Sequence, residues 1–142
     1  MKEQNFKNHT QFVPGFHIVG FTLVLALLAG SIRAFIQADA SSRYSASLLI
    51  LVSVVFIIIF WYARSFALKA QDRAIRAEEN FRHFIITGKP LDKELRLSQI
   101  IALRFASDEE FPALAKKAVA EKISAKEIKQ SIQHWRGDYH RV

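Results

Sequence analysis

The segment that most constrains this chain is Ser47–Leu68, SLLILVSVVFIIIFWYARSFAL. It begins as an uncharged apolar run and passes through an aromatic pair, Trp61 and Tyr62. No glycine or proline separates it from the charged sequence KAQDRAIRAEENFRHF that follows. About 20 apolar residues suffice for a helix to cross a bilayer, and in lipid the backbone must satisfy its own hydrogen bonds. Residues 47–68 are therefore predicted to form a transmembrane helix that continues into water.

A second apolar segment precedes it at residues 15–36, which carry no Asp, Glu, Lys or Arg before Arg33. This length also predicts a membrane span, with Arg33 reaching toward the interface. The polar residues 37–46, QADASSRYSA, form an external loop short enough to join two antiparallel helices. Ser42 or Ser45 is expected to cap the second helix. The two segments together predict a transmembrane hairpin.

Basic residues predict the orientation of this hairpin. The chain has a formal net charge of +7, and Lys2 and Lys7 lie in residues 1–14, an expected interfacial segment. Cytoplasmic segments beside membrane spans are enriched in Lys and Arg, so both termini are predicted to be cytoplasmic. The basic cluster after the second span has two interpretations, the same topology bias or binding of anionic headgroups. It consists of Arg64, Lys69, Arg73 and Arg76.

Small side chains recur every four residues along the first predicted span. Such stripes allow close approach of another helix. The simpler interpretation is that the stripe packs against the second span of the same chain, and the alternative is contact with a partner subunit. The stripe consists of Thr22, Ala26, Gly30 and Ala34. Neither span has a charged residue at its centre, which argues against a transport path through the chain.

Residues 69–88 are predicted to form a stalk helix that continues the second span. Glu78 and Arg82 have the spacing of a favourable ion pair on its exposed side. Gly88 is expected to end the helix in a left-handed conformation. The apolar face expected to support the rest of the chain includes Phe81, Phe84 and Ile85.

Residues 89–142 are predicted to form a small helical module of about three short helices. Two capping boxes are expected, Ser107 with Glu110 and Ser124 with Glu127, and Gly137 is expected to end the last helix. The apolar faces are predicted to contain Leu97, Ile100, Ile101 and Phe105, then Phe111, Leu114, Ala115, Ala118 and Val119, then Ile128, Ile132 and Trp135. So small a module needs support from the stalk or another subunit. The fold class is therefore all-α.

The C-terminal residues WRGDYHRV form a candidate contact tail. Trp135, Tyr139 and Arg141 are of the residue types that anchor interfaces. The alternative is that Trp135 completes the module core, because it follows Ile128 and Ile132 at helical spacing.

Nothing in the sequence predicts catalysis. Cysteine is absent, which excludes disulfides and thiolate sites. His134, Asp138 and His140 match no compact zinc spacing, and the acidic run DEE is explained by the start of a helix. We therefore expect no catalytic residues, cofactor or metal. Basic residues alternate with acidic ones and no groove-reading helix is evident, so nucleic acid is not an expected partner.

The sequences QNFKNH, PGFH, FALKAQDRAIRAEENFRHF, TGKPLD, QIIALRFASDEEFPALA, KEIK and HWRGDYHRV resemble an uncharacterised family of small bacterial membrane proteins. The resemblance covers nearly the whole chain. It implies two spans, a short helical tail and a bacterial inner-membrane location, and it implies no activity because the family is a domain of unknown function.

These observations predict a multi-pass inner-membrane protein that is not an enzyme. Its expected role is an interaction or scaffold protein that presents the helical module. The alternative is an accessory or regulatory subunit of a membrane transporter or membrane enzyme. The lipid bilayer is one expected partner, and either further copies of the chain or another membrane protein is the second.

Overall fold

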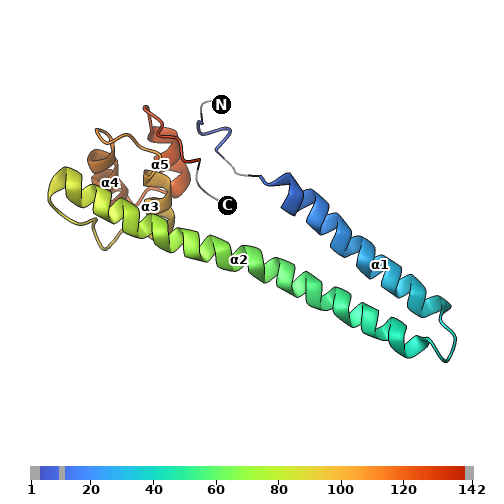
Figure 1. Cartoon of the computed structure of the whole chain (residues 1–142). Helices are drawn as coiled ribbons and strands as arrows, with labels where there is room; N and C mark the ends of the chain where they lie inside the picture. The colour runs from blue at the N-terminus through green and yellow to red at the C-terminus, as the bar shows by residue number, and fades with distance from the viewer. Residues whose placement is uncertain (1–3, 10–11, 140–142) are drawn as a thin grey trace. The chain divides into compact units, whose positions relative to one another are not determined.

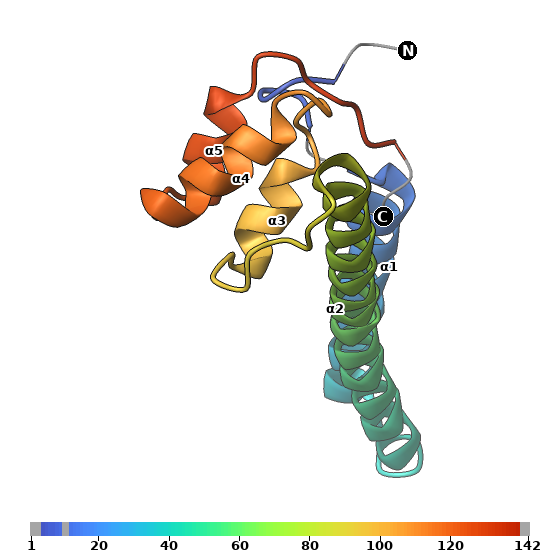
Figure 2. The ribbon, with the colours of Figure 1, turned by 90° about the vertical axis from the view of Figure 1, so that its left-hand side faces the viewer.

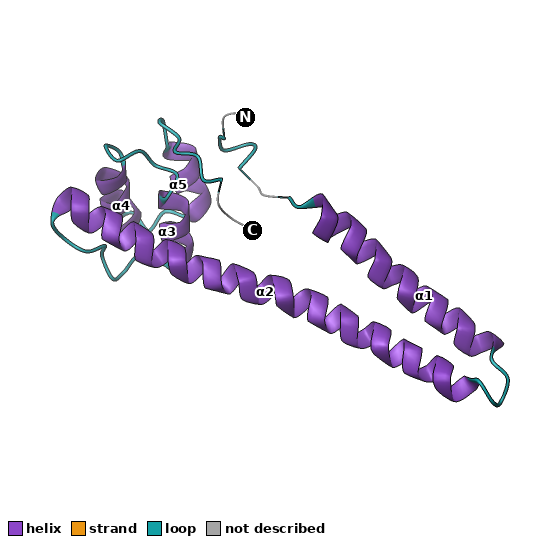
Figure 3. Cartoon of the chain, in the orientation of Figure 1, coloured by secondary structure: helices purple, strands orange, loops and turns teal. Residues whose placement is uncertain are grey.

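The computed structural model describes residues 4–9 and 12–139. The described residues form helices joined by loops, with no strand among them (Figures 1 and 3), and this confirms the predicted all-α class. In chain order the helices are η1 (Gly15–Gly20, a π-helical turn), α1 (Phe21–Gln37), α2 (Arg43–Thr87), α3 (Leu97–Leu103), α4 (Phe111–Ala120) and α5 (Ala125–Ser131). The chain divides into two compact units, Phe12–Ala67 and Leu68–Val142 together with Met1–Gln11.

The first unit, which we call the apolar hairpin, pairs η1 and α1 with the beginning of α2. Residues 38–42 turn the chain between the helices. The carboxylate of Asp39 accepts hydrogen bonds from the hydroxyl groups of Ser41 and Ser42 and from the backbone N–H of Ser42, 2.9 Å away. The bonds from Ser42 lower the pKa of Asp39 below its usual 3.8. Ser42 directly precedes α2 and donates to Asp39, and the expectation that Ser42 or Ser45 caps the second helix stays a prediction.

The two arms of the hairpin meet through a polar contact and through aromatic rings. The hydroxyl oxygens of Ser31 and Ser53, both buried, lie 3.1 Å apart. The rings of Phe16 and Phe60 stack with their centroids 4.1 Å apart. Gly20 permits this approach, because a Cβ atom there would lie 2.9 Å from the ring of Phe60.

Helix α2 continues without interruption for 45 residues and ends where the sequence predicts. Gly88 takes a φ of 71°, and its N–H donates to the carbonyl of Phe84 over 2.8 Å. A left-handed glycine after the last turn is a common helix end.

In the second unit, α3, α4 and α5 lie beside the C-terminal end of α2 (Figures 1 and 2). We call the part of this unit that follows α2 the helical module. Its apolar core consists of Leu91, Leu95, Ile100, Ala102, Leu103, Ala106, Phe111, Ala115, Ala118 and Ile128. The capping box of Ser124 and Glu127 at the start of α5 is confirmed. Hydrogen bonds from Ser124 lower the pKa of Glu127 below 4.5.

Two predictions about the short helices are wrong. Leu97 is exposed, so the buried face of α3 is shared by Ile100, Ala102 and Leu103. The capping box at α4 is only half formed. The Ser107 hydroxyl accepts from the backbone N–H of Glu110 over 3.4 Å, but no side-chain cap completes the pair.

The stalk supports the module with a face that the sequence does not predict. Phe81, Phe84 and Ile85 are 63%, 51% and 67% exposed, whereas Ile75 and Glu79 are 6% exposed. The supporting face is therefore mixed, with one apolar and one acidic side chain, and it is not the predicted aromatic face. Arg82 likewise departs from the prediction, because it pairs with Glu79 and Asp108 and not with Glu78.

Candidate interaction site

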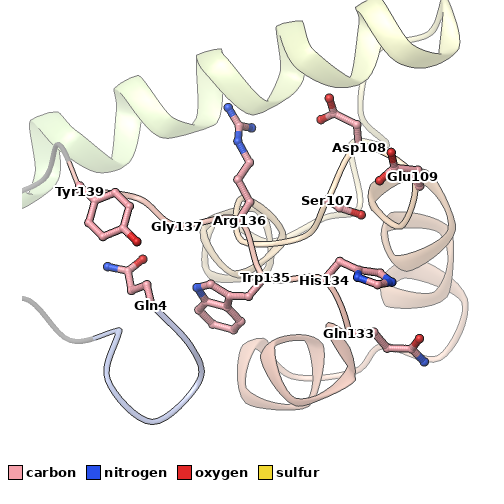
Figure 4. A pocket seen from close by; sticks show the side chains of 10 residues that line it. All are labelled: Gln4, Ser107, Asp108, Glu109, Gln133, His134, Trp135, Arg136, Gly137 and Tyr139. Atoms are coloured by element: carbon pink, nitrogen blue, oxygen red, sulfur yellow. The ribbon is translucent and has the colours of Figure 1, made fainter. Parts of the chain in front are cut away.

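An open groove of about 740 Å³ runs along the C-terminal segment of the module (Figure 4). We call it the tail groove. It is lined by Gln4, Ser107, Asp108, Glu109, Gln133, His134, Trp135, Arg136, Gly137 and Tyr139.

The groove exists because the last helix ends early. Helix α5 stops at Ser131, and the residues after it are not helical, so the prediction that Gly137 ends the helix is wrong. Trp135 bridges Ala106 in antiparallel fashion, and the N–H of Arg136 donates to the carbonyl of Phe105 over 2.7 Å. These backbone bonds hold the tail against the segment between α3 and α4.

Glu110 fastens the same tail from the other side. Its carboxylate accepts the backbone N–H groups of Gln133 and His134 over 3.2 and 3.0 Å. Glu110 is therefore used for a long-range contact and not for the capping box that its spacing suggests. Both N–H groups would otherwise lack a partner in the extended tail.

Trp135 packs within the module. Its ring stacks on buried Phe105 with centroids 4.6 Å apart and planes 19° apart. His9 lies against both rings, 5.6 Å from Phe105 and 5.8 Å from Trp135. The predicted core role of Trp135 thus has structural support, although the helical register from which it was inferred is wrong.

Residues 4–9 form the other wall, a contact that the sequence analysis missed. The side-chain amide of Gln4 donates to the carbonyl of Asp138 over 3.0 Å and accepts its N–H over 2.8 Å. His9 Nδ1 lies 2.7 Å from the carbonyl of Phe6, and Nε2 lies 3.0 Å from Lys129 Nζ. A carbonyl can only accept, so Nδ1 carries the proton and Nε2 accepts from Lys129. No short-range pattern signals bonds between residues 134 positions apart.

The remaining tail residues differ in how firmly they are held. Asp138 pairs with buried Arg104 over 3.2 Å, and the guanidinium of Arg104 lies 4.6 Å above the ring of Phe105. Tyr139 is 51% exposed and rests on Gly137, where a Cβ atom would come within 2.6 Å of the ring. Arg141 and His140 lie outside the described residues. Tyr139 is therefore the predicted contact residue that the tail presents outward.

The groove is acidic at one end and uncharged at the other (Figure 4). Asp108 and Glu109 lie at the acidic end, Gln4 and Tyr139 lie at the other, and Arg136 lies between them. The pKa of Glu109 is lowered by its own backbone N–H and by the Ser107 hydroxyl. Over residues 4–9 and 12–139, no group of three or more His, Asp or Glu residues is placed to hold a metal ion. The groove offers hydrogen-bonding groups and an exposed aromatic ring on an open surface.

The two other predicted surfaces lie outside this groove. Lys69, Arg73 and Arg76 are exposed on α2, and Arg64 is half-buried.

The small-residue stripe is exposed along its whole length. The stripe comprises Thr22, Ala26, Gly30 and Ala34. A Cβ atom at Gly30 would meet nothing within 4 Å. The interpretation that the stripe packs against the second arm is therefore wrong, because the arms meet through Gly20 of η1 and Ser31 of α1.

Two helices are long and apolar enough to cross a membrane, Gly15–Gln37 and Arg43–Thr87. These helices and the small module define a class of all-helical protein with an apolar hairpin and a polar helical module. The chain belongs to a family of unknown function, DUF6526, whose model matches residues 1–142. No match to the chain was found among curated proteins or among solved structures.

Proposed function

We propose that the chain is an integral membrane protein whose apolar hairpin spans the bilayer and presents the helical module for interaction with other proteins. The exposure of the hairpin carries this proposal. In the most apolar stretch of each long helix, only 6% and 11% of the residues are buried within the chain. The core helix of a soluble protein would be mostly buried, and exposed apolar patches of this size need lipid or a partner.

The contacts of residues 4–9 support a common side for the two ends of the chain. Gln4 and Asp138 belong to one compact unit, and a hairpin with two spans returns the chain to the side from which it started. The excess of Lys and Arg after the second span supports the cytoplasm as this side. The resemblance to bacterial membrane proteins supports a bacterial inner membrane as the proposed location.

The role that we propose is interaction and not catalysis. The tail groove is open, its Ser107 is engaged at the start of α4, and the neighbouring Asp138 is paired with Arg104. An accessory or regulatory subunit of a membrane transporter or membrane enzyme is the second candidate. The exposed small-residue stripe would allow close packing of a partner helix against the hairpin.

Single cysteines test the topology cleanly, because the chain has none of its own. Ser41→Cys lies in the loop between the spans, and Gln130→Cys lies on the exposed surface of α5. In spheroplasts a membrane-impermeant maleimide is expected to label Ser41→Cys alone, and labelling of Gln130→Cys is expected only after lysis. Extraction of the chain by carbonate without detergent, or equal labelling of both sites in intact cells, would contradict the proposal.

A further inference from the structure

Helix α2 carries an exposed apolar seam on the side opposite the module. Its positions are separated alternately by four and three residues, and all five are exposed: Ala70, Ala74, Ala77, Phe81 and Phe84. At roughly 100° per residue these positions lie on the far side of the helix from Ile75 and Glu79, which the module covers. We call this surface the α2 seam. All five side chains remain exposed, and Ala77 borders a hollow that it shares with Leu91 and Leu95 of the module.

This spacing is the pattern of a two-stranded coiled coil. Apolar residues that alternate by four and three positions occupy the a and d sites of a heptad, and they keep one face toward a partner helix. Ala74 and Phe81 then occupy a sites, and Ala77 and Phe84 occupy d sites. Alanine at these sites permits a close approach of two backbones, and the two phenylalanines supply most of the apolar area.

The charges beside the α2 seam match a parallel copy of themselves. In this register Arg73 occupies a g site and Glu78 the e site of the next heptad. In a parallel coiled coil the g residue of one helix faces the following e residue of the other. A symmetric pair of helices would therefore form two ion pairs, each between Arg73 of one copy and Glu78 of the other.

Both side chains are available for this contact. Arg73 and Glu78 are exposed, and neither forms an ion pair with another residue in the part of the chain that the structure describes. Glu78 lacks the partner that its spacing suggests, because Arg82 turns to Glu79 and Asp108.

We infer that the α2 seam binds the same seam of a second copy of the chain, in parallel and in register. The parallel orientation rests on the proposed function, since two copies with one topology in one membrane direct their α2 helices the same way. A second copy supplies both matching charges, because its own Glu78 and Arg73 stand in the same register.

Cysteine crosslinking of the full chain in native membranes tests the contact. A disulfide needs Cα atoms about 4.4–6.8 Å apart, a distance that two d sites of a parallel pair can meet. Ala77→Cys is expected to give an oxidised dimer of twice the chain mass. Arg76→Cys is the matched control, because it is exposed one residue away and points to another side of α2.

Charge reversal identifies the partner as a second copy. Arg73→Glu alone or Glu78→Arg alone replaces two attractions by two repulsions, and each should weaken dimerisation in detergent about tenfold. The double variant Arg73→Glu/Glu78→Arg restores the pairing and is expected to return the dimer to the level of the unmodified chain. Only a contact between like surfaces predicts this rescue.

The outcomes separate this inference from the membrane proposal. A chain that is embedded in the membrane but gives equal crosslinking at Ala77→Cys and Arg76→Cys would overturn the dimer and leave the membrane proposal standing. A crosslinked product of another mass, or a double variant no better than the single ones, would also overturn it. A chain that leaves the membrane with carbonate refutes the membrane proposal itself.

Discussion

Replacement of Arg82 tests the polar contact between α2 and the helical module. Its side chain is 11% exposed. It donates to Glu79 over 3.0 Å, to Asp108 over 2.7 Å and to the carbonyl of Ala106 over 2.7 Å. The guanidinium also lies 4.6 Å above the ring of Phe111. Arg82→Ala removes all four interactions at once.

The loss of stability in Arg82→Ala depends on how deeply each partner of Arg82 is buried. The side chain of Glu79 is 9% exposed, so its carboxylate would remain buried without a partner. Removal of one member of such a pair costs about 3–5 kcal/mol. Asp108 is 67% exposed, and Asp108→Asn should therefore cost no more than about 1 kcal/mol. Because small domains have only about 5–15 kcal/mol of stability, Arg82→Ala should remove a large fraction of the module's free energy of unfolding.

Tryptophan fluorescence can report on the module alone. Trp61→Phe leaves Trp135 as the remaining tryptophan, and Trp135 stacks on the module core. Urea titration of the full chain in mild detergent then gives the free energy of unfolding. Arg76→Ala, at an exposed position of the same helix, is the control and should have little effect.

The compensating variant decides whether burial of charge is the cause. Glu79→Leu/Arg82→Met removes both charges and should recover most of the stability, since apolar replacements of buried ion pairs are often neutral or better. If Arg82→Ala unfolds at the same urea concentration as Arg76→Ala, or if the double variant is no more stable than Arg82→Ala, the reasoning is refuted.

Three further predictions concern the same module. A fragment that begins at Leu91 should show no cooperative thermal transition, whereas one that begins at Leu68 and keeps the supporting part of α2 should melt cooperatively. Calorimetry measures both transitions, and a sharp melt of the shorter fragment would contradict this prediction. Deletion of residues 1–9 should shift the emission of Trp135 to longer wavelength, because it removes the ring that covers the tryptophan; an unchanged spectrum would contradict this. Glu127→Gln should destabilise the module at neutral pH, and the difference in free energy of unfolding from the unmodified chain should vanish on acidification. The reason is that folding lowers the pKa of Glu127, so its carboxylate contributes stability above the usual pKa of 4.5 and loses it as the pH falls through the pKa of the folded state. An equal difference at both pH values, measured by urea titration, would refute this last prediction.

Features that depend on a few consecutive residues could be predicted from the sequence. The end of α2 follows from Gly88, and the start of α5 follows from Ser124 and Glu127. Both are backbone requirements that a single turn of chain satisfies. The apolar helices could be predicted for the same reason, since length and composition decide them.

Features that depend on distant partners could not be predicted. The spacing of Trp135 after Ile128 suggests a continued helix, but the tail pairs with the backbone of Phe105 and Ala106. Glu110 has the sequence context of a cap, yet it binds N–H groups 23 and 24 residues away. A local pattern shows which bonds a side chain can make, and the fold decides which of them it makes.

Helix α2 inverts the usual rule of burial, and this inversion links the fold to the proposed dimer. It buries Glu79 and Arg82 against the module and exposes Phe81 and Phe84. Complete burial of a phenylalanine contributes about 1.5–3 kcal/mol, and the helix does not gain this free energy while Phe81 and Phe84 face water. A second copy on the α2 seam would recover this free energy and would also pair the Glu78 that Arg82 leaves free. The two faces of α2 thus depend on each other. Because Arg82 pairs with Glu79 and Asp108 of the module contact, Glu78 stays available for a second copy on the other side.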